Sequence, residues 1–357
     1  MKKPLLSQHP LEQEYRRSSR KAVLLLLFCS LLVLVCGLWF TAVGTADATP
    51  SDIFGALRGA FFHGGRLENA NQKIVLLLRL PRICLAILCG AGLSVSGAAL
   101  QGVTRNPLVS PFTVGISSAA AFGASLSIVY GVGPLGDTNT GIVISAFAWS
   151  LLCAAGVYFI ASRAGMSPES IILTGIATNY LFNACDSVVK FFANDYQLAA
   201  AVQWLFGSLN GATWPQVLVV LLFSLPCLAG IYSFAQPLNT LAGGDDDVSR
   251  SLGVSPAFVR IGVGFLSVLL TASIISFTGV IGFVGLAGPH IARLLIGSDH
   301  RFLLPFSALS GALLVLTGDT IGRIILSPVN VPVGIVVSFL GVPIFIHLIL
   351  KERREVS

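Results

Sequence analysis

The stretch Arg79-Leu80-Pro81-Arg82 stands directly before a long apolar segment and marks where the chain enters an apolar phase. Charge is scarce elsewhere, because only 11% of the 357 residues are charged and 54% are hydrophobic. Two fixed cations at the edge of such a segment are typical of a membrane interface, where basic side chains reach the headgroup region. The arginines either anchor lipid headgroups or bind an acidic partner, and the two interpretations imply different functions.

The composition places the chain in a lipid bilayer. The mean hydropathy is +0.84, and a soluble domain with so many apolar side chains would expose large hydrophobic patches. A membrane-spanning helix needs about 20 apolar residues, and the chain supplies many such runs. We therefore predict an all-α, polytopic membrane protein. The net charge of +6 does not indicate nucleic-acid binding, because the basic residues form short clusters at the ends of apolar runs.

Ten apolar segments predict ten transmembrane helices in one domain over residues 22–350, between tails at 1–21 and 351–357. The first run is too long for the apolar region of a signal peptide, so we expect it to be retained. Pro111 and Pro332 favour helix starts for the third and tenth segments. Glycines make the boundary between the seventh and eighth segments difficult to place. The segments are 22–43, 83–100, 112–130, 141–162, 171–193, 216–234, 260–277, 281–296, 305–321 and 331–350.

Lys and Arg in the connecting loops predict the orientation, because cytoplasmic loops carry an excess of basic residues. With the N-terminus in the cytoplasm, most of the 22 Lys and Arg residues fall inside. Ten spans then put both termini in the cytoplasm. The exceptions are concentrated around the opening stretch; those left outside are Arg58, Arg66, Lys73, Arg79, Arg82, Lys190 and Arg323.

The sequence contains none of the common catalytic or nucleotide-binding patterns. A Gly-rich phosphate loop ending in Gly-Lys-Ser/Thr, a His-Glu-x-x-His motif and a Gly-x-Ser-x-Gly motif are all missing. We expect no enzyme activity, no cofactor and no metal site in this chain. His290, after Gly288-Pro289, fits a structural role at a helix break. The seven cysteines lie inside apolar segments without metal-ligand or disulfide spacing, which favours a packing role.

The cytoplasmic loop 239–257 contains a predicted short helix, Asp245-Asp246-Asp247-Val248-Ser249-Arg250-Ser251-Leu252-Gly253. Acidic residues at its start and a basic residue near its end complement the helix dipole. Gly253 suits the position just past the helix, and Ser255-Pro256 suits the start of the next one. From spacing alone, the segment is equally consistent with a surface for a partner and with a plain connection.

The fifth segment carries polar residues inside an apolar run. Asn179, Asn183 and Asp186 share one helical face by their spacing. Ionisable residues in a span usually face the bundle interior or water, so this face either lines a polar path or forms interhelical hydrogen bonds. Lys190 follows Asp186 by one turn and either pairs with it or reaches the outer interface.

Further motifs occur in a fixed order from about residue 51 onward. They are Arg79-Leu80-Pro81-Arg82, Gly90-Ala91-Gly92-Leu93 with Gly97 and Gln101, Arg105-Asn106-Pro107-Leu108, Trp204 with Gly207-Ser208-Leu209 and Trp214, Arg250-Ser251-Leu252-Gly253-Val254, Gly282-Phe283-Val284-Gly285-Leu286, Gly288-Pro289-His290-Ile291-Ala292-Arg293, His300-Arg301 with Leu304-Pro305, Gly318-Asp319, and Pro332-Val333-Gly334-Ile335-Val336. In this order, the chain resembles the FecCD-type permease subunits of binding-protein-dependent ABC importers, which carry iron(III)-siderophores, haem and vitamin B12.

The resemblance implies a type II ABC importer permease fold in the inner (cytoplasmic) membrane. It implies a second permease subunit (another copy or a paralogue), two copies of an ABC ATPase subunit inside, and a periplasmic or lipid-anchored substrate-binding protein outside. In such permeases the loop matching 241–254 docks in a groove of the ATPase. The ATPase-coupling residues would then be Asp245, Asp246, Asp247, Arg250, Ser251, Leu252 and Gly253. The three consecutive aspartates and Ser249 depart from the usual pattern, which bears on the choice of ATPase.

The resemblance also gives the opening arginines a role. Family members use outward-facing arginines to pair with glutamates of the binding protein, and the matching positions here are Arg79, Arg82 and Arg323. Ferric chelates are the commonest cargo of the family, so we expect an iron(III)-siderophore, with haem or cobalamin as alternatives. A different class, an ion-coupled secondary transporter with Asp186 as the ion site, is a further hypothesis.

Overall fold

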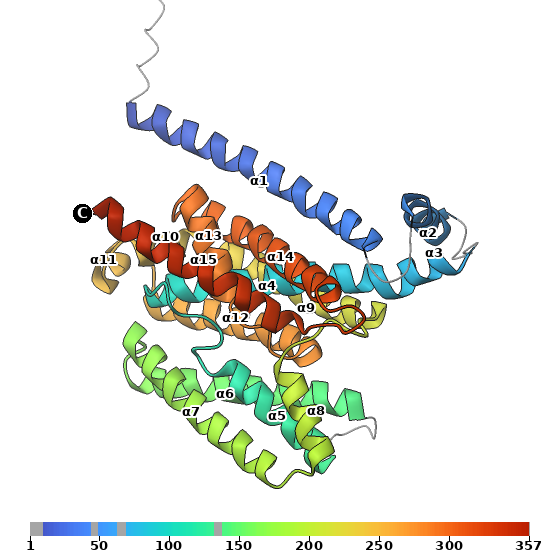
Figure 1. Cartoon of the computed structure of the whole chain (residues 1–357). Helices are drawn as coiled ribbons and strands as arrows, with labels where there is room; N and C mark the ends of the chain where they lie inside the picture. Colours follow the sequence, from blue (N-terminus) through green and yellow to red (C-terminus); the bar gives the residue numbers. More distant parts are fainter. Residues whose placement is uncertain (1–9, 44–48, 63–68, 132–137, 357) are drawn as a thin grey trace, which may run out of the picture.

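The computed structural model describes residues 10–43, 49–62, 69–131 and 138–356, and every regular element in these ranges is helical (Figure 1). Along the chain the elements are α1 (Pro10–Ala42), α2 (Pro50–Phe62), α3 (Ala70–Ile74), the π-helical turn η1 (Val75–Arg79), α4 (Leu80–Thr104), α5 (Ile116–Tyr130), α6 (Thr138–Arg163), α7 (Pro168–Phe191), α8 (Asp195–Leu205), α9 (Trp214–Ser233), α10 (Ala235–Ala242), α11 (Asp246–Ser251), α12 (Pro256–Thr278), α13 (Val284–Ile296), α14 (His300–Ile324) and α15 (Val333–Val356).

The predicted fold class is confirmed. Each predicted apolar segment lies in a different helix, namely α1, α4, α5, α6, α7, α9, α12, α13, α14 and α15 in chain order. Within the described residues, 6 helices are long and apolar enough to cross a membrane, and α5, α13 and the first part of α15 are shorter apolar helices. The remaining one, α7, is long enough at 24 residues but more polar.

Two predicted helix starts need correction. Helix α5 begins at Ile116 rather than near Pro111, because Ser110 and Thr113 form a hydrogen-bonded turn before it. Gly115 then enters the helix with a φ of 84°, a left-handed conformation that glycine adopts without strain. Helix α13 begins at Val284, a few residues later than predicted, after a non-helical turn that follows α12.

The opening stretch lies inside a longer helical rod than the sequence predicted. Helix α3, the π turn η1 and helix α4 follow one another directly, so the chain is helical over 35 residues from Ala70 to Thr104. The π turn ends at Arg79, two residues before Pro81, which lacks a backbone N–H. Single π turns inside α-helices occur frequently at functional sites. The short helices α2, α8 and α10 were also not predicted.

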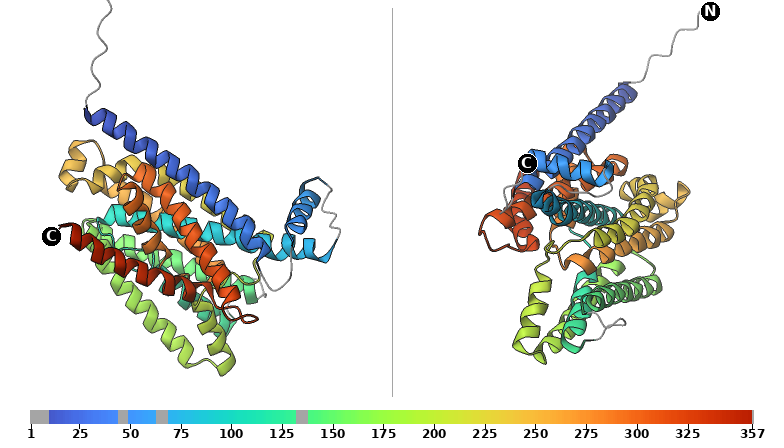
Figure 2. Two further views of the ribbon diagram at one scale, coloured as in Figure 1. Left: turned by 45° about the horizontal axis from the view of Figure 1, so that its top comes forward. Right: turned by 90° about the vertical axis from the view of Figure 1, so that its right-hand side faces the viewer.

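Helix α4 is the central element of the bundle and packs against α9, α12, α13 and α14, while α5, α6 and α7 form a neighbouring group (Figures 1 and 2). Small residues allow the close crossings. A Cβ atom added to Gly90 would lie 2.2 Å from the backbone oxygen of Gly311, and one added to Gly97 would lie 1.9 Å from that of Gly285. Such small-residue contacts drive helix association in lipid.

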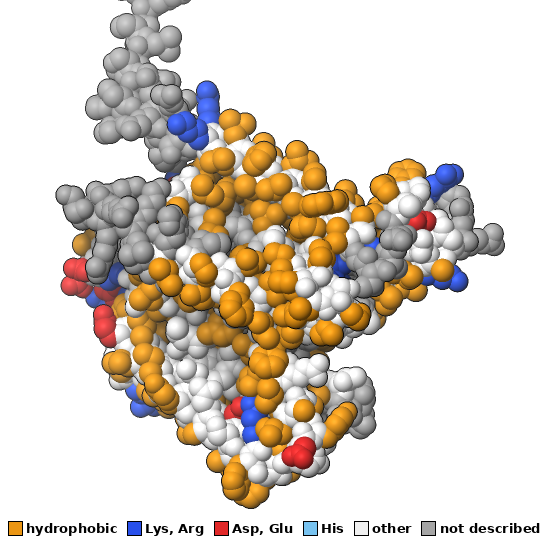
Figure 3. Space-filling model, viewed as in Figure 1, with side chains coloured by type: hydrophobic (Ala, Val, Ile, Leu, Met, Phe, Trp, Pro, Cys, Tyr) orange, Lys and Arg blue, Asp and Glu red, His pale blue; other side chains and the backbone are white. Residues whose placement is uncertain are grey.

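The surface separates an apolar belt from charged ends. Figure 3 shows hydrophobic side chains over most of one face, with charged side chains gathered mainly at its two ends. One end carries α11, the start of α1 and the end of α15, whereas α2 and α3 lie at the other (Figures 1 and 2). The two ends of the described chain therefore lie on the same side, as an even number of spans requires.

Candidate functional site at the two ends of the bundle

Helix α11 is a short, well-terminated helix at the end of the bundle that carries the termini. Its N-cap residue is Asp245, and it ends in a glycine motif in which the Gly253 N–H donates to the Arg250 oxygen at 2.9 Å and the Val254 N–H to the Ser249 oxygen at 3.0 Å. Gly253 has a φ of 82°. The prediction of this helix is confirmed. Ser255 precedes α12 as expected, but its side chain makes no cap hydrogen bond.

The three consecutive aspartates have different environments. The Asp246 carboxylate faces the bundle and accepts hydrogen bonds from both terminal nitrogens of Arg260, at 2.7 and 2.8 Å, and from Nη2 of Arg105 at 2.8 Å. The hydrogen bonds from Arg260 are the main reason that the pKa of Asp246 lies below its ordinary value. Asp247 points outward, is 92% exposed, and pairs only with Arg250 of its own helix at 2.7 Å.

The outward face of α11 also carries apolar side chains. Val248 is 50% exposed and Leu252 is 67% exposed, at the end of the bundle and beside charged residues. A leucine in that position gains little from lipid, because the apolar belt lies along the helices of the bundle. Exposed hydrophobic groups rimmed by polar ones mark protein contacts. This face can therefore bind a partner.

The opposite end of the bundle carries a second cluster, centred on Asp319 of α14. Arg82 donates from Nε to both carboxylate oxygens, at 3.0 and 2.9 Å, and from Nη2 at 2.7 Å. Nε of Arg323 lies 3.3 Å from the same carboxylate. Asp319 is 1% exposed, so α4 and α14 are joined by a buried ion pair with a second cation beside it. Arg82 also bonds to Asn210 at the surface, at 2.6 Å.

Arg323 of this cluster and the nearby Arg79 both bind backbone oxygens at the C-terminal end of α1. Arg79 donates to the backbone oxygens of Thr41 and Ala42 at 2.7 and 3.1 Å, and Arg323 donates to those of Val43 and Phe40 at 2.8 and 3.3 Å. The last carbonyls of a helix lack internal partners and favour nearby cations. The structure thus brings together all three arginines predicted for docking, but it engages them with the chain itself. Their docking role stays a prediction.

The polar face of α7 has a mixed environment. Asn183 is exposed and donates to Asn179 at 3.3 Å, whereas Asp186 is buried and pairs with Lys190 at 2.5 Å. The predicted pairing of Asp186 with Lys190 is confirmed. An exposed amide on a helix at the edge of the bundle is available to a second subunit or to a path between subunits. Path lining by Asn179, Asn183 and Asp186 stays a prediction.

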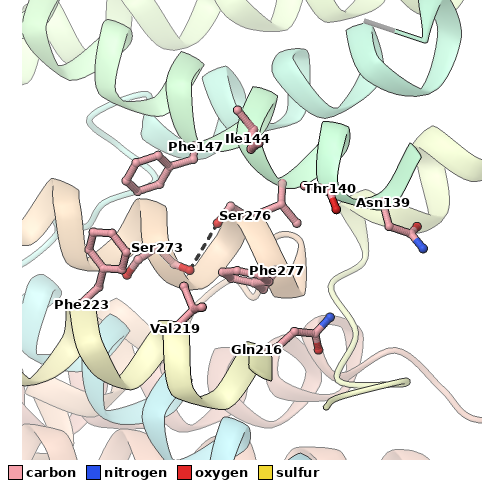
Figure 4. A pocket seen from close by; sticks show the side chains of 11 residues that line it. Asn139, Thr140, Ile144, Phe147, Gln216, Val219, Phe223, Ser273, Ser276 and Phe277 are labelled. Atoms are coloured by element: carbon pink, nitrogen blue, oxygen red, sulfur yellow. Dashed lines mark hydrogen bonds between the residues drawn. The ribbon is translucent and has the colours of Figure 1, made fainter. Parts of the chain in front are cut away.

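A cavity of about 510 Å³ opens between α6, α9 and α12 (Figure 4). Phe147, Phe223 and Phe277 form much of its wall, while Ser273 and Ser276 lie at its floor. Its lining residues include no charged group, so it offers no counter-charge for an ionic cargo. A second cavity, of about 570 Å³, lies between the turn after α12 and the first half of α15, and it too is lined mainly by apolar residues.

Sequence reasoning missed three residues that organise the two clusters: Asp319, Arg260 and Arg105. Asp319 and Arg105 were noticed only as parts of motifs, and Arg260 only as a basic residue on the inside. The available signal was an isolated charge inside or beside an apolar run, because such charges are costly and are usually paired. The sequence did not show which acidic residue pairs with which basic residue, because these contacts join residues far apart in the sequence.

An all-helical membrane bundle with a short, exposed helix at one charged end has the features of a transport permease. The chain belongs to the FecCD transport family, whose family model matches residues 29–351. The hemin transport system permease protein HmuU of Yersinia pestis is 39% identical over 293 residues, which are 81% of this chain and 87% of that protein. The cobalamin import system permease protein BtuC of Halobacterium salinarum is 38% identical over 295 residues, 81% of this chain and 76% of that protein.

A solved structure agrees. An inward-facing ABC transporter classed as metal-chelate type has a TM-score of 0.81 and 31% sequence identity to this chain, covering 92% of this chain and 99% of that one. This chain is therefore an ABC importer permease, a transport component of the membrane. Permeases of this family work with an ATPase and a second permease.

Proposed function

We propose that this chain forms the translocation path for an iron(III)-siderophore, together with a second permease subunit, in the inner membrane. Hemin and metal chelates, the cargoes named for two of the relatives, are both organic ligands wrapped around a metal. A ferric siderophore belongs to the same chemical class. Haem and cobalamin are the alternative cargoes, since one relative is named for each. Both termini are proposed to lie in the cytoplasm.

The exposed face of α11 is the main support for the proposal that a separate ATPase subunit drives transport. Helix α11 presents Val248 and Leu252 to water and is fixed to the bundle through Asp246, so it can transmit the movement of a bound partner to the bundle. We place the ATPase subunit on this face. ATP binding and hydrolysis in two ATPase copies would move α10 and α11, and the paired permeases would switch the facing of a path between them. The permease itself performs no bond chemistry.

Substitution at Leu252 tests ATPase docking. Leu252→Asp puts a charge into the proposed contact and should reduce co-purification of the ATPase subunit by about ten-fold or more, as is usual for an interface anchor. Leu326→Asp is the matched control, because Leu326 is also an exposed leucine, 62% accessible, but lies just after α14 at the opposite end of the bundle. That variant should keep its ATPase. Unchanged stoichiometry with Leu252→Asp would remove α11 as the docking site.

Uptake measurements test the cargo. The permease is reconstituted in proteoliposomes with its ATPase and binding protein, and ATP-dependent uptake of radioactive iron(III) is measured as a hydroxamate chelate. Hemin and cobalamin are measured in parallel. Saturable uptake of the hydroxamate chelate alone supports the proposal, whereas uptake of only hemin or only cobalamin would replace it with that cargo.

We also propose that the binding protein docks at the outer end, over Arg79, Arg82 and Arg323. An arginine fork suits the bidentate binding of a carboxylate. Because Arg323 also terminates α1, the test needs a charge-preserving control. Arg323→Lys keeps the cation and Arg323→Gln removes it. Docking lost with glutamine and at least partly retained with lysine, at equal thermal stability of the two variants, supports a direct contact; wild-type docking by both variants refutes one.

A further inference from the structure

Arg260 is one of the largest fully buried side chains in the described part of the chain, although it carries a permanent charge. It is 1% exposed and lies in the second turn of α12. Its two terminal nitrogens hold both oxygens of Asp246, at 2.7 and 2.8 Å, which is the bidentate arrangement that fixes the orientation as well as the distance of two groups. Helix α11 and helix α12 are therefore joined by a rigid contact.

The other hydrogen bonds of Arg260 reach two more elements. Nη1 donates to the backbone oxygen of Met166, in the turn between α6 and α7, at 3.0 Å. Nε donates to the backbone oxygen of Val103, at the end of α4, at 3.3 Å. One buried side chain thus contacts α4, the α6–α7 turn and α11 while belonging to α12.

Arg105 strengthens the same junction from the exposed side. Its Nε donates to the backbone oxygen of Leu241 in α10 at 2.7 Å, and its Nη2 donates to Asp246 at 2.8 Å. Asp246 is then the point where α10, α11 and the end of α4 meet the buried guanidinium. Its neighbour Asp247 has no part in this junction, because its 92% exposed side chain pairs within α11.

A buried ion pair is weak support for stability, because apolar residues of similar volume often stabilise a protein as well or better. What an ion pair with fixed geometry does supply is a defined connection between elements that must keep their relative positions. Energetic coupling between distant parts of a protein runs through such contiguous networks of hydrogen bonds and rigid elements. The network around Arg260 joins α11 to three separate parts of the bundle, namely α12, the end of α4 and the α6–α7 turn.

We propose that Arg260 is a positioning residue that transmits the displacement of α11 to α4, α12 and the α6–α7 turn, with Asp246 as its contact on α11. This inference rests on the proposed function of α11 as the ATPase-docking helix. It separates two roles on that helix: the outward residues bind the ATPase, and Asp246 passes the movement inward. Loss of the inner contact should uncouple ATP hydrolysis from transport without releasing the ATPase.

The test compares Asp246→Asn with Asp247→Asn, which remove the same charge from adjacent residues. The complete complex is reconstituted in proteoliposomes, and three quantities are measured: co-purified ATPase, the rate of ATP hydrolysis, and iron(III)-chelate imported per ATP hydrolysed. Asp246→Asn should retain the ATPase and lower import per ATP by about five-fold or more, since network positions modulate coupling on that scale. Asp247→Asn should weaken ATPase binding and leave the ratio of import to hydrolysis unaltered. Asp246→Glu, which restores the carboxylate, should recover part of that ratio.

Arg260→Lys is the second variant, and it decides the result if Asp246→Asn fails to fold. Lysine keeps the cation near Asp246 but cannot form the fork or reach the Met166 and Val103 oxygens together. It should also lower import per ATP. Wild-type import per ATP in the assembled variants would overturn the proposal, while the Leu252→Asp result on ATPase docking would still stand. Failure of the docking proposal is distinguishable, because it appears as unaltered co-purification with Leu252→Asp.

Discussion

Asp319 should be the charge whose removal most destabilises the end of the described bundle that carries α2 and α3. Its carboxylate is 1% exposed and lies between Arg82, which is 16% exposed, and Arg323, which is 10% exposed. Asp319→Asn keeps the volume of the side chain but leaves two guanidinium groups without their counter-charge. Removing one partner of a buried ion pair typically costs about 3–5 kcal/mol. We expect the lower end, about 3 kcal/mol, because Arg82 retains Asn210 and Arg323 retains backbone oxygens of α1.

The assay is thermal and denaturant unfolding of the purified protein in detergent micelles. At about 2–4 °C per kcal/mol for a sizeable domain, the expected fall in Tm is about 6 °C or more. Asp247→Asn is the control, because it removes a carboxylate from an exposed ion pair whose expected contribution is at most about 1 kcal/mol. A double variant, Asp319→Asn with Arg323→Gln, should lose less stability than the sum of the two single variants, because one uncompensated cation is also removed.

Additive losses in the double variant, or equal stability of Asp319→Asn and Asp247→Asn, would refute this reasoning. The first result would mean that Arg323 does not depend on Asp319. The second would mean that water reaches the cluster and solvates its charges, so this end of the bundle would be more open than the structure shows.

Three further predictions concern packing, pH and redox state. Gly97→Ala should greatly reduce the amount of folded protein, because its Cβ atom would lie 1.9 Å from a backbone oxygen of α13. Gly156→Ala should be neutral, because nothing lies within 4 Å of that position. The expression level and the Tm of the two variants check this. Burial alone would raise the pKa of Asp299, but hydrogen bonds from Arg301 and Asn239 outweigh it and hold the pKa at about 2. This carboxylate should therefore stabilise the fold above about pH 4 and lose that contribution as the pH falls toward 2. In unfolding measured over a series of pH values, Asp299→Asn should abolish this pH dependence. All seven cysteines are free thiols, so a reducing agent should not shift the Tm.

Hydropathy was enough to predict the fold, but it did not predict the structure at the two ends of the bundle. Each of the apolar segments produced a helix, because an apolar run in lipid can satisfy its backbone only by becoming helical. The helical stretch before Arg82 was missed because polar residues between Asn69 and Lys73 resemble a loop, and the π turn has no sequence signature. Helix α11 was predicted correctly because its caps are local: an aspartate at one end and a glycine at the other.

Contacts between distant residues were beyond the reach of the sequence. The outward orientation predicted for the arginine cluster came from loop charge and family resemblance, and neither could show that Arg79 and Arg323 terminate α1. The three consecutive aspartates appeared equivalent for the same reason. Only the fold separates Asp246, which meets a buried guanidinium 14 positions along the chain, from Asp247, which faces water.

The two clusters at opposite ends of the bundle each place one carboxylate between two arginines. Arg105 and Arg260 belong to other elements than Asp246, whereas Arg323 lies one turn after Asp319 in α14 and only Arg82 comes from another helix. They differ in exposure, because the Asp319 side chain is 1% exposed and the Asp246 side chain is 28% exposed. A buried carboxylate such as Asp319 resists separation from its cations, since the separated charge would be left unsolvated. At the other end, Arg260 is 1% exposed and holds Asp246 to the bundle, while part of the Asp246 carboxylate faces water, so this cluster can move together with α11. This difference fits the proposal that α11 follows a bound ATPase while α1, α4 and α14 are held together at the opposite end of the bundle. It predicts that amide hydrogens of α10 and α11 exchange faster than those of α14 around Asp319, and that ATPase binding slows exchange at the inner end alone.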